Sequence, residues 1–159
     1  MHIEGPVDPD VDLHDREQRR ELSRHPAAVL GAISAGGVVG ALSRYGLSEL
    51  LAHKPGEWPW ATWLTNVSGC LLIGVLMVLI SEVWPAHPLL RPFLGVGVLG
   101  GYTTFSTALV DVQQLVRAGA PGLGLLYLGG TALAALAAVA VGWAFARVVV
   151  RRAGKAVAR

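Results

Sequence analysis

Charged residues are scarce in this chain: only 15% of its 159 residues are Asp, Glu, Lys or Arg, while 53% are apolar. This balance is too poor in charge for an ordinary soluble domain of the same size. Cysteine is nearly missing as well, and the single Cys70 excludes an intrachain disulfide. Because Cys70 lies inside an apolar run, we interpret it as a small packing residue.

The sequence also lacks the residue clusters that catalysis and transition metals need. Its five histidines lie in the polar N-terminal segment or in predicted loops. No spacing resembles a pair of carboxylates, a nucleophile with its base, an HxxxH metal pair or a phosphate-binding loop. We therefore expect a protein that is not an enzyme.

Four long uncharged runs dominate the chain, covering residues 27–43, 58–81, 92–110 and 118–146. Each meets or nearly meets the ~17–25 residues that cross about 30 Å of hydrocarbon. We predict an all-α integral membrane protein with four transmembrane helices in a lipid bilayer. The transmembrane domain is expected over 27–147. It follows a disordered polar tail over 1–26 and precedes a basic tail over 148–159.

The basic residues are unevenly divided between the two sides of the membrane. Four spans bring both tails to one side, while the other side has only Lys54 and Arg117, leaving out Arg44 inside its helix. Lys and Arg collect on the cytoplasmic side, which predicts a multi-pass protein of the cell membrane with both termini cytoplasmic. The C-terminal charges are then a membrane anchor, and we expect no nucleic-acid partner. The ten basic residues of the tail side are Arg16, Arg19, Arg20, Arg24, Arg91, Arg147, Arg151, Arg152, Lys155 and Arg159.

The third run has an unusual composition for a membrane-spanning helix. Eight of the nineteen residues from 92 to 110 are Gly, Ser or Thr. Gly100 and Gly101 are adjacent and are followed by Thr103 and Thr104, which are poor helix formers. We predict that the third helix is broken near its middle, with the break over 100–103. The alternative is a face of small residues for close helix packing.

A few polar side chains interrupt the other runs. Arg44 lies near the far end of the first run, where it either snorkels to the interface or provides a fixed charge that attracts anions. Thr62 and Asn66 are four residues apart and share one helix face. Asn66 is either a contact between helices or an amide donor facing a pore. Tyr127 and Thr131 form a second short polar stripe.

These residues together resemble the Fluc (CrcB) family of fluoride channels. Three segments carry the resemblance in the family's order, one to a helix: GGVVGALSRY at 36–45, TWLTNVSGCLLIG at 62–74 and GVLGGYTTFST at 97–107. The third segment is the most specific. The resemblance covers about residues 27–147. It implies passive efflux of fluoride from the cytoplasm, an antiparallel dimer with two narrow pores, and a central Na⁺ that is structural and not transported.

The resemblance also assigns roles to individual residues. It implies that the backbone carbonyls of Gly100 and Thr103 hold the Na⁺, and that Arg44 is a charge in the vestibule. The residues that it implies along the fluoride path are Thr62, Asn66, Phe105, Ser106, Thr107, Tyr127 and Thr131. Hydroxyl and amide donors suit a small, strongly hydrated anion, and carbonyl oxygens suit a hard cation. The positive edge of an aromatic ring can also meet an anion.

Two positions depart from the family pattern. The family usually reads TTFSTF, but Ala108 replaces the second Phe, and Ala135 stands where the fourth helix is expected to be polar. Either one pore is incomplete in a homodimer, or the chain forms a heterodimer with a paralogous subunit. The uneven basic charge favours the heterodimer. Two other functions stay open: a small proton-coupled exporter, and a non-conducting partner subunit.

Overall fold

The computed structural model describes residues 26–83 and 89–157, and every regular element in these ranges is helical. Apart from Pro26, the predicted N-terminal tail lies outside the described residues. The elements are α2 (Pro26–Leu50), α3 (Trp60–Glu82), the π-helix η1 (Arg91–Leu99), α4 (Gly100–Tyr102), α5 (Phe105–Arg117) and α6 (Pro121–Val157). Four helical stretches are long and apolar enough to cross a membrane: Pro26–Leu50, Trp60–Glu82, Arg91–Arg117 and Pro121–Ala153. The prediction of an all-helical protein with four such helices is confirmed.

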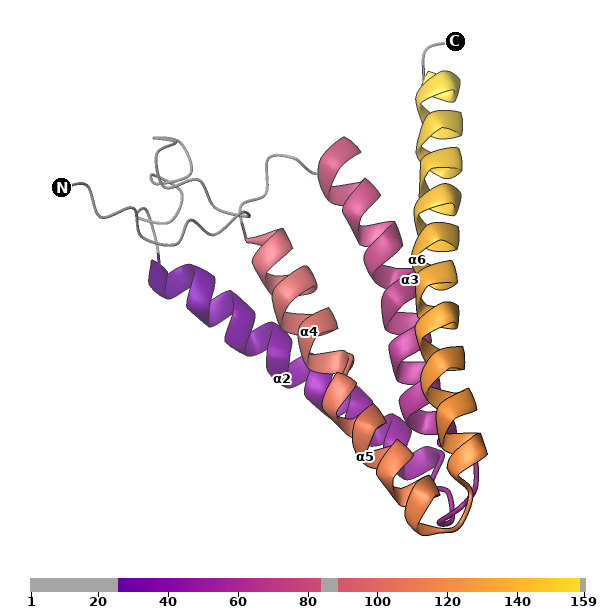
Figure 1. Cartoon of the computed structure of the whole chain (residues 1–159). Helices are drawn as coiled ribbons and strands as arrows, with labels where there is room; N and C mark the ends of the chain where they lie inside the picture. Colours follow the sequence, from indigo (N-terminus) through magenta and orange to yellow (C-terminus); the bar gives the residue numbers. More distant parts are fainter. Residues whose placement is uncertain (1–25, 84–88, 158–159) are drawn as a thin grey trace, which may run out of the picture.

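The helices form two closely packed pairs that diverge from one end of the molecule (Figure 1). One pair is α3 with α6, and the other is α2 with η1 and α4. The two pairs form a V. α5 runs from the second pair to α6 and so joins the two pairs at the closed end of this V. The start of α2 and the end of α6 lie at the open end, as an even number of spans requires.

Glycines at the crossings allow the backbones within each pair to touch. A Cβ atom on Gly40 of α2 would collide with the carbonyl oxygen of Val98. In the other pair, a Cβ atom on Gly142 of α6 would collide with the carbonyl oxygen of Leu71. Such contacts are the usual way in which membrane helices associate, since burying apolar side chains gains little in lipid. The glycines at these crossings are therefore accounted for by packing.

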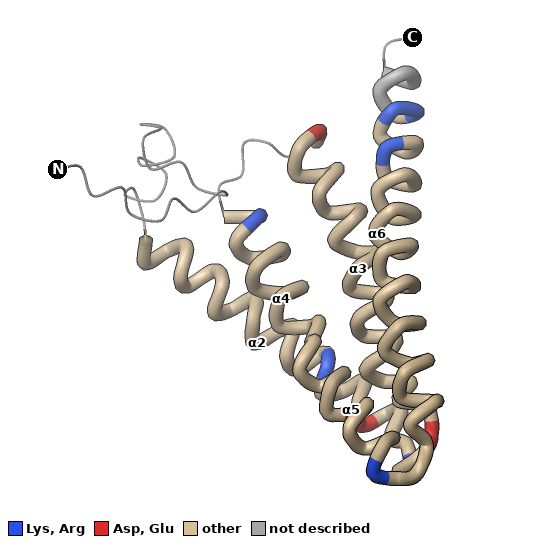
Figure 2. The backbone as a smooth tube through the Cα atoms, viewed as in Figure 1, with Lys and Arg blue, Asp and Glu red and all other residues tan. Residues whose placement is uncertain are grey.

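Charged residues gather toward the two ends of the helices and leave a long uncharged middle (Figure 2). At the open end, Arg147 of α6 lies 3.5 Å from the Glu82 carboxylate of α3 and stacks over Trp143, with 4.5 Å between the guanidinium carbon and the ring centroid. α6 continues beyond this contact to Val157, through residues that the sequence predicts as a separate tail. Its 37 residues give a length of about 55 Å, more than a bilayer core requires.

Candidate functional site

Two residues in extended conformation separate α4 from α5. Thr103 has φ −79° and ψ 158°, and Thr104 has φ −155° and ψ 126°. Gly100 and Gly101, which the sequence places inside the break, are helical. The reason is a close contact with α2, because a Cβ atom on Gly101 would lie 2.6 Å from the carbonyl oxygen of Gly37. The β-branched threonines, which favour extended backbone, occupy the interruption itself.

Asn66 of α3 binds both backbone groups of Thr104. Its side-chain Nδ2 donates to the carbonyl oxygen of Thr104, and its Oδ1 accepts from the Thr104 amide, each across 2.8 Å. The bond to Oδ1 pairs the Thr104 amide, which loses its helical acceptor and would cost several kcal/mol if left unpaired in hydrocarbon. Asn66 is therefore a contact between helices, one of its N–H bonds is not used by Thr104, and its role as a pore donor stays a prediction.

Thr104 in turn caps the N-terminus of α5. Its Oγ1 accepts from the backbone amide of Thr107 across 3.2 Å and donates to the Thr107 hydroxyl across 3.0 Å. The Ser106 hydroxyl lies 3.3 Å from the same oxygen. Sequence analysis gave no role to Thr104, although threonine three residues before a helical amide is a typical N-cap pattern.

These contacts change which carbonyl groups are paired. In a continuous helix, the amides of Thr104 and Thr107 would donate to the carbonyls of Gly100 and Thr103. Here they donate to side-chain oxygens of Asn66 and Thr104 instead. The carbonyls of Gly100 and Thr103, which the resemblance assigns to Na⁺, are among those that lose their helical donors at the break. Oxygen ligands of this kind suit a hard cation, so the residues present fit such an ion.

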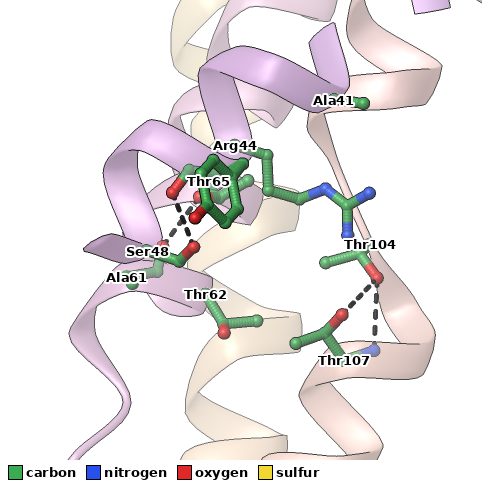
Figure 3. Close-up of a pocket in the computed structure, with 9 residues that line it drawn as sticks. Ala41, Arg44, Ser48, Ala61, Thr62, Thr65, Thr104 and Thr107 are labelled. Atoms are coloured by element: carbon green, nitrogen blue, oxygen red, sulfur yellow. Dashed lines mark hydrogen bonds between the residues drawn. The ribbon is translucent and has the colours of Figure 1, made fainter. Parts of the chain in front are cut away.

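Arg44 reaches across from α2 to the segment before the break. Its Nε donates to the carbonyl oxygen of Gly101 across 3.2 Å. Next to it lies a cavity of about 210 Å³, into which α2, α3 and α5 all contribute side chains (Figure 3). Six hydroxyl residues and one guanidinium line this cavity, which is chemistry suited to an anion. The lining consists of Ala41, Arg44, Tyr45, Ser48, Ala61, Thr62, Thr65, Thr104 and Thr107.

The predicted path residues fall into two further groups. Phe105 and Ser106 lie on the surface at the start of α5, and Phe105 is 72% exposed. Tyr127 and Thr131 are buried, where the Thr131 hydroxyl donates to the Tyr127 carbonyl across 2.6 Å. Tyr127 packs with Ala108 and Leu115 in the core and makes an edge contact with Trp58, with 5.3 Å between ring centroids.

The structure thus brings Thr62, Thr107 and Arg44 together at the cavity and places Asn66 at the break. Phe105 and Ser106 are exposed, whereas Tyr127 and Thr131 are buried, so neither pair lies at the cavity. The fluoride path assigned to these residues stays a prediction. Sequence analysis also missed Ser48 and Thr65, which line the cavity. Ser48 lies four residues after Arg44, a spacing that puts both on one face of α2.

Comparison with known proteins agrees with the residue pattern. The chain matches the family described as "CrcB-like protein, Camphor Resistance (CrcB)" over residues 31–143. It is 55% identical over 120 residues to "Fluoride-specific ion channel FluC 2" of Nocardia farcinica, covering 76% of this chain and 86% of that one.

Relatives from Streptomyces avermitilis are similar too. Its "Fluoride-specific ion channel FluC 2" is 47% identical over 130 residues, covering 82% of each chain. Its "Fluoride-specific ion channel FluC 3" is 38% identical over 137 residues, covering 86% of this chain and 67% of that one. The four membrane-length helices, the interrupted backbone at Thr103 and Thr104, and these matches lead to one conclusion: this chain belongs to the CrcB-like family.

Proposed function

We propose that this chain is a subunit of a fluoride-specific ion channel that lets fluoride leave the cytoplasm passively and so lowers its toxicity. The observation that carries the proposal is the interrupted third helix, with the Arg44 guanidinium and several hydroxyls beside it at membrane depth. A charge and polar groups in a transmembrane bundle are costly, and they mark pathways for ions. The names of the relatives indicate the ion.

The proposed path uses donors that replace the water around fluoride. Thr62 and Thr107 line the cavity, and the N–H of Asn66 that Thr104 leaves unused adds an amide donor. The remaining path residues in the proposal are Phe105, Ser106, Tyr127 and Thr131. Phe105 supplies the positive edge of its ring. Arg44 attracts anions into the cavity.

The Na⁺ in this proposal is structural, and the carbonyl oxygens of Gly100 and Thr103 hold it. Two oxygens from one chain are too few for a cation of this kind. Gly100 is exposed, and a Cβ atom there would meet only the Gly95 carbonyl, at 3.9 Å. A second subunit facing Gly100 would bring the same two carbonyls again. This supports a dimer whose axis passes near the break.

We further propose that the two subunits are antiparallel, in the cell membrane, with the termini of this subunit cytoplasmic. The exposed Phe105 and Ser106 then face the partner. Streptomyces avermitilis has relatives numbered FluC 2 and FluC 3, so one organism can hold more than one such chain. This supports a heterodimer with a paralogous subunit, and the homodimer is the alternative.

A proton-coupled exporter is the second candidate, because Asp111 is a carboxylate buried to 5% exposure inside a membrane-length helix. Fluoride efflux from liposomes separates the two. Purified protein is reconstituted in K⁺-loaded liposomes, and release is recorded with a fluoride electrode. A channel needs valinomycin to carry the compensating K⁺ and does not respond to a pH gradient. An exporter releases fluoride according to the pH gradient. A non-conducting subunit gives the slow leak of empty liposomes.

A further inference from the structure

We propose that Asn66 and Thr104 are positioning residues that create the cation site, because they divert the two amides that would otherwise occupy its carbonyls. The inference rests on the proposed function for the identity of the ion. It gives Asn66 a role different from that of a fluoride donor. Its evidence is the hydrogen bonding around the break.

Two backbone amides at the break donate to side chains. The Thr104 amide goes to Asn66 Oδ1 at 2.8 Å, which releases the Gly100 carbonyl. The Thr107 amide goes to Thr104 Oγ1 at 3.2 Å, which releases the Thr103 carbonyl. In a continuous helix, the amides of Thr104 and Thr107 would donate to these carbonyls, which lie four residues earlier in the chain. The side chains of Asn66 and Thr104 therefore hold the two amides that would otherwise bond to the Gly100 and Thr103 carbonyls.

The carbonyls on either side of Gly100 are occupied. Gly101 O accepts from Arg44 Nε at 3.2 Å. Leu99 O accepts from both the amide and the hydroxyl of Thr103, each at 2.9 Å. Besides attracting anions in the proposed function, Arg44 thus bonds the Gly101 carbonyl, which lies between Gly100 and Thr103 in the chain.

α3 holds the break in this conformation through one short segment. A Cβ atom on Gly69 would collide with the Cγ2 of Thr103, so the threonine fits only because position 69 is glycine. Asn66 and Gly69 are three residues apart and lie on the same helix face. Ser68 contacts the segment too, since its hydroxyl lies 3.0 Å from the Tyr102 hydroxyl. Ser68 diverts no backbone donor, which makes it a suitable control.

The inference predicts that changes at Asn66 and Thr104 act first on Na⁺ affinity. The purified protein is melted in detergent over a series of Na⁺ concentrations, with N-methyl-D-glucamine keeping the ionic strength constant. The Na⁺ concentration that gives half of the stabilisation is the readout. For Asn66→Leu and Thr104→Val we expect it to rise about tenfold, the equivalent of one lost hydrogen bond. Thr104→Ser, which keeps the capping oxygen, and Ser68→Ala are expected to keep the wild-type midpoint.

Fluoride release at low and at saturating Na⁺ gives the second readout. If the two residues act through the cation site, high Na⁺ restores release in Thr104→Val. If both variants release little fluoride while their Na⁺ midpoints stay at the wild-type value, the residues act on fluoride directly and the inference is wrong. The same holds if Na⁺ does not stabilise the wild type. Should Asn66→Leu not fold, the comparison of Thr104→Val with Thr104→Ser decides alone.

These outcomes are separate from those of the proposed function. A wild-type protein that Na⁺ stabilises but that releases no fluoride contradicts the channel and leaves the positioning roles intact. A wild-type protein that releases fluoride, with variants whose Na⁺ midpoints do not move, contradicts the positioning roles and leaves the channel intact.

Discussion

The Tyr127 hydroxyl donates a hydrogen bond to the Asp111 carboxylate, with 3.3 Å between the two oxygens, where α6 packs on α5. Tyr127 has no exposed surface, and Asp111 is 5% exposed. Tyr127 also belongs to the core cluster with Ala108 and Leu115, which joins α5 to α6. A buried carboxylate without a hydrogen-bond donor is costly. The Tyr127 hydroxyl therefore stabilises the end of the molecule where α5 packs on α6.

Tyr127→Phe is therefore expected to destabilise the protein by about 1–3 kcal/mol, because the ring still fills its site while Asp111 loses its donor. Thermal melting of the purified protein in detergent measures the change. In the double variant Tyr127→Phe with Asp111→Leu, the unpaired carboxylate is gone as well, and we expect part of the stability to return. Equal stability of Tyr127→Phe and the wild type would mean that the hydrogen bond contributes nothing.

Two glycines of α6 give a matched test of the helix packing. Gly142→Ala is expected to destabilise the α3–α6 pair by at least about 1 kcal/mol, because its Cβ atom would collide with the Leu71 carbonyl. Gly129→Ala is the control, since a Cβ atom there would meet nothing within 4 Å. Melting temperatures of both variants are compared. A Gly142→Ala variant as stable as Gly129→Ala would show that the two backbones do not touch.

Phe105→Ile tests the aromatic ring at the start of α5. Phe105 is 72% exposed in the single chain, so its replacement removes little packing within the subunit. We expect fluoride release from liposomes to fall about tenfold or more, because the positive ring edge is lost while the apolar surface is kept. The amount of folded protein after gel filtration is the control. Unchanged release would remove Phe105 from the path.

Orientation in the membrane tests the heterodimer. Ten basic residues on the tail side against two on the other side predict that this chain inserts only with its tails inside. Two reporters fused to the C-terminus, one active inside and one active outside the cell, are expected to differ strongly in cells without a paralogue. Comparable signals from both, together with full fluoride resistance from this chain alone, would support the homodimer.

The helical architecture was predictable because hydropathy alone fixes which stretches cross a membrane. The position of the break was harder to predict from the sequence. The sequence indicates a break from the glycine doublet, but Gly101 packs against Gly37 in a helical conformation. The two threonines that follow are extended. Distinguishing a packing glycine from a helix-breaking one needs the neighbouring helix, which lies 64 residues away in the chain for this pair (101 minus 37).

The candidate site was predictable as a set of residues but not as a set of contacts. Asn66 stands out in an uncharged run, but only the structure shows that both polar atoms of the Asn66 side chain bond to the backbone of Thr104. The sequence does not show that Asp111 has a hydrogen-bond partner, since Tyr127 lies on another helix. The C-terminal basic residues looked like a tail, whereas α6 continues through them to Val157.

The central claim is that this chain conducts fluoride selectively. The most direct measurement compares fluoride with chloride release from liposomes that contain the purified protein and Na⁺, each driven by the same K⁺ gradient with valinomycin. The account predicts rapid release of fluoride, while chloride leaves no faster than from empty liposomes. Equal release of both anions, or fluoride release no faster than from empty liposomes even when a paralogous chain is added, would contradict it.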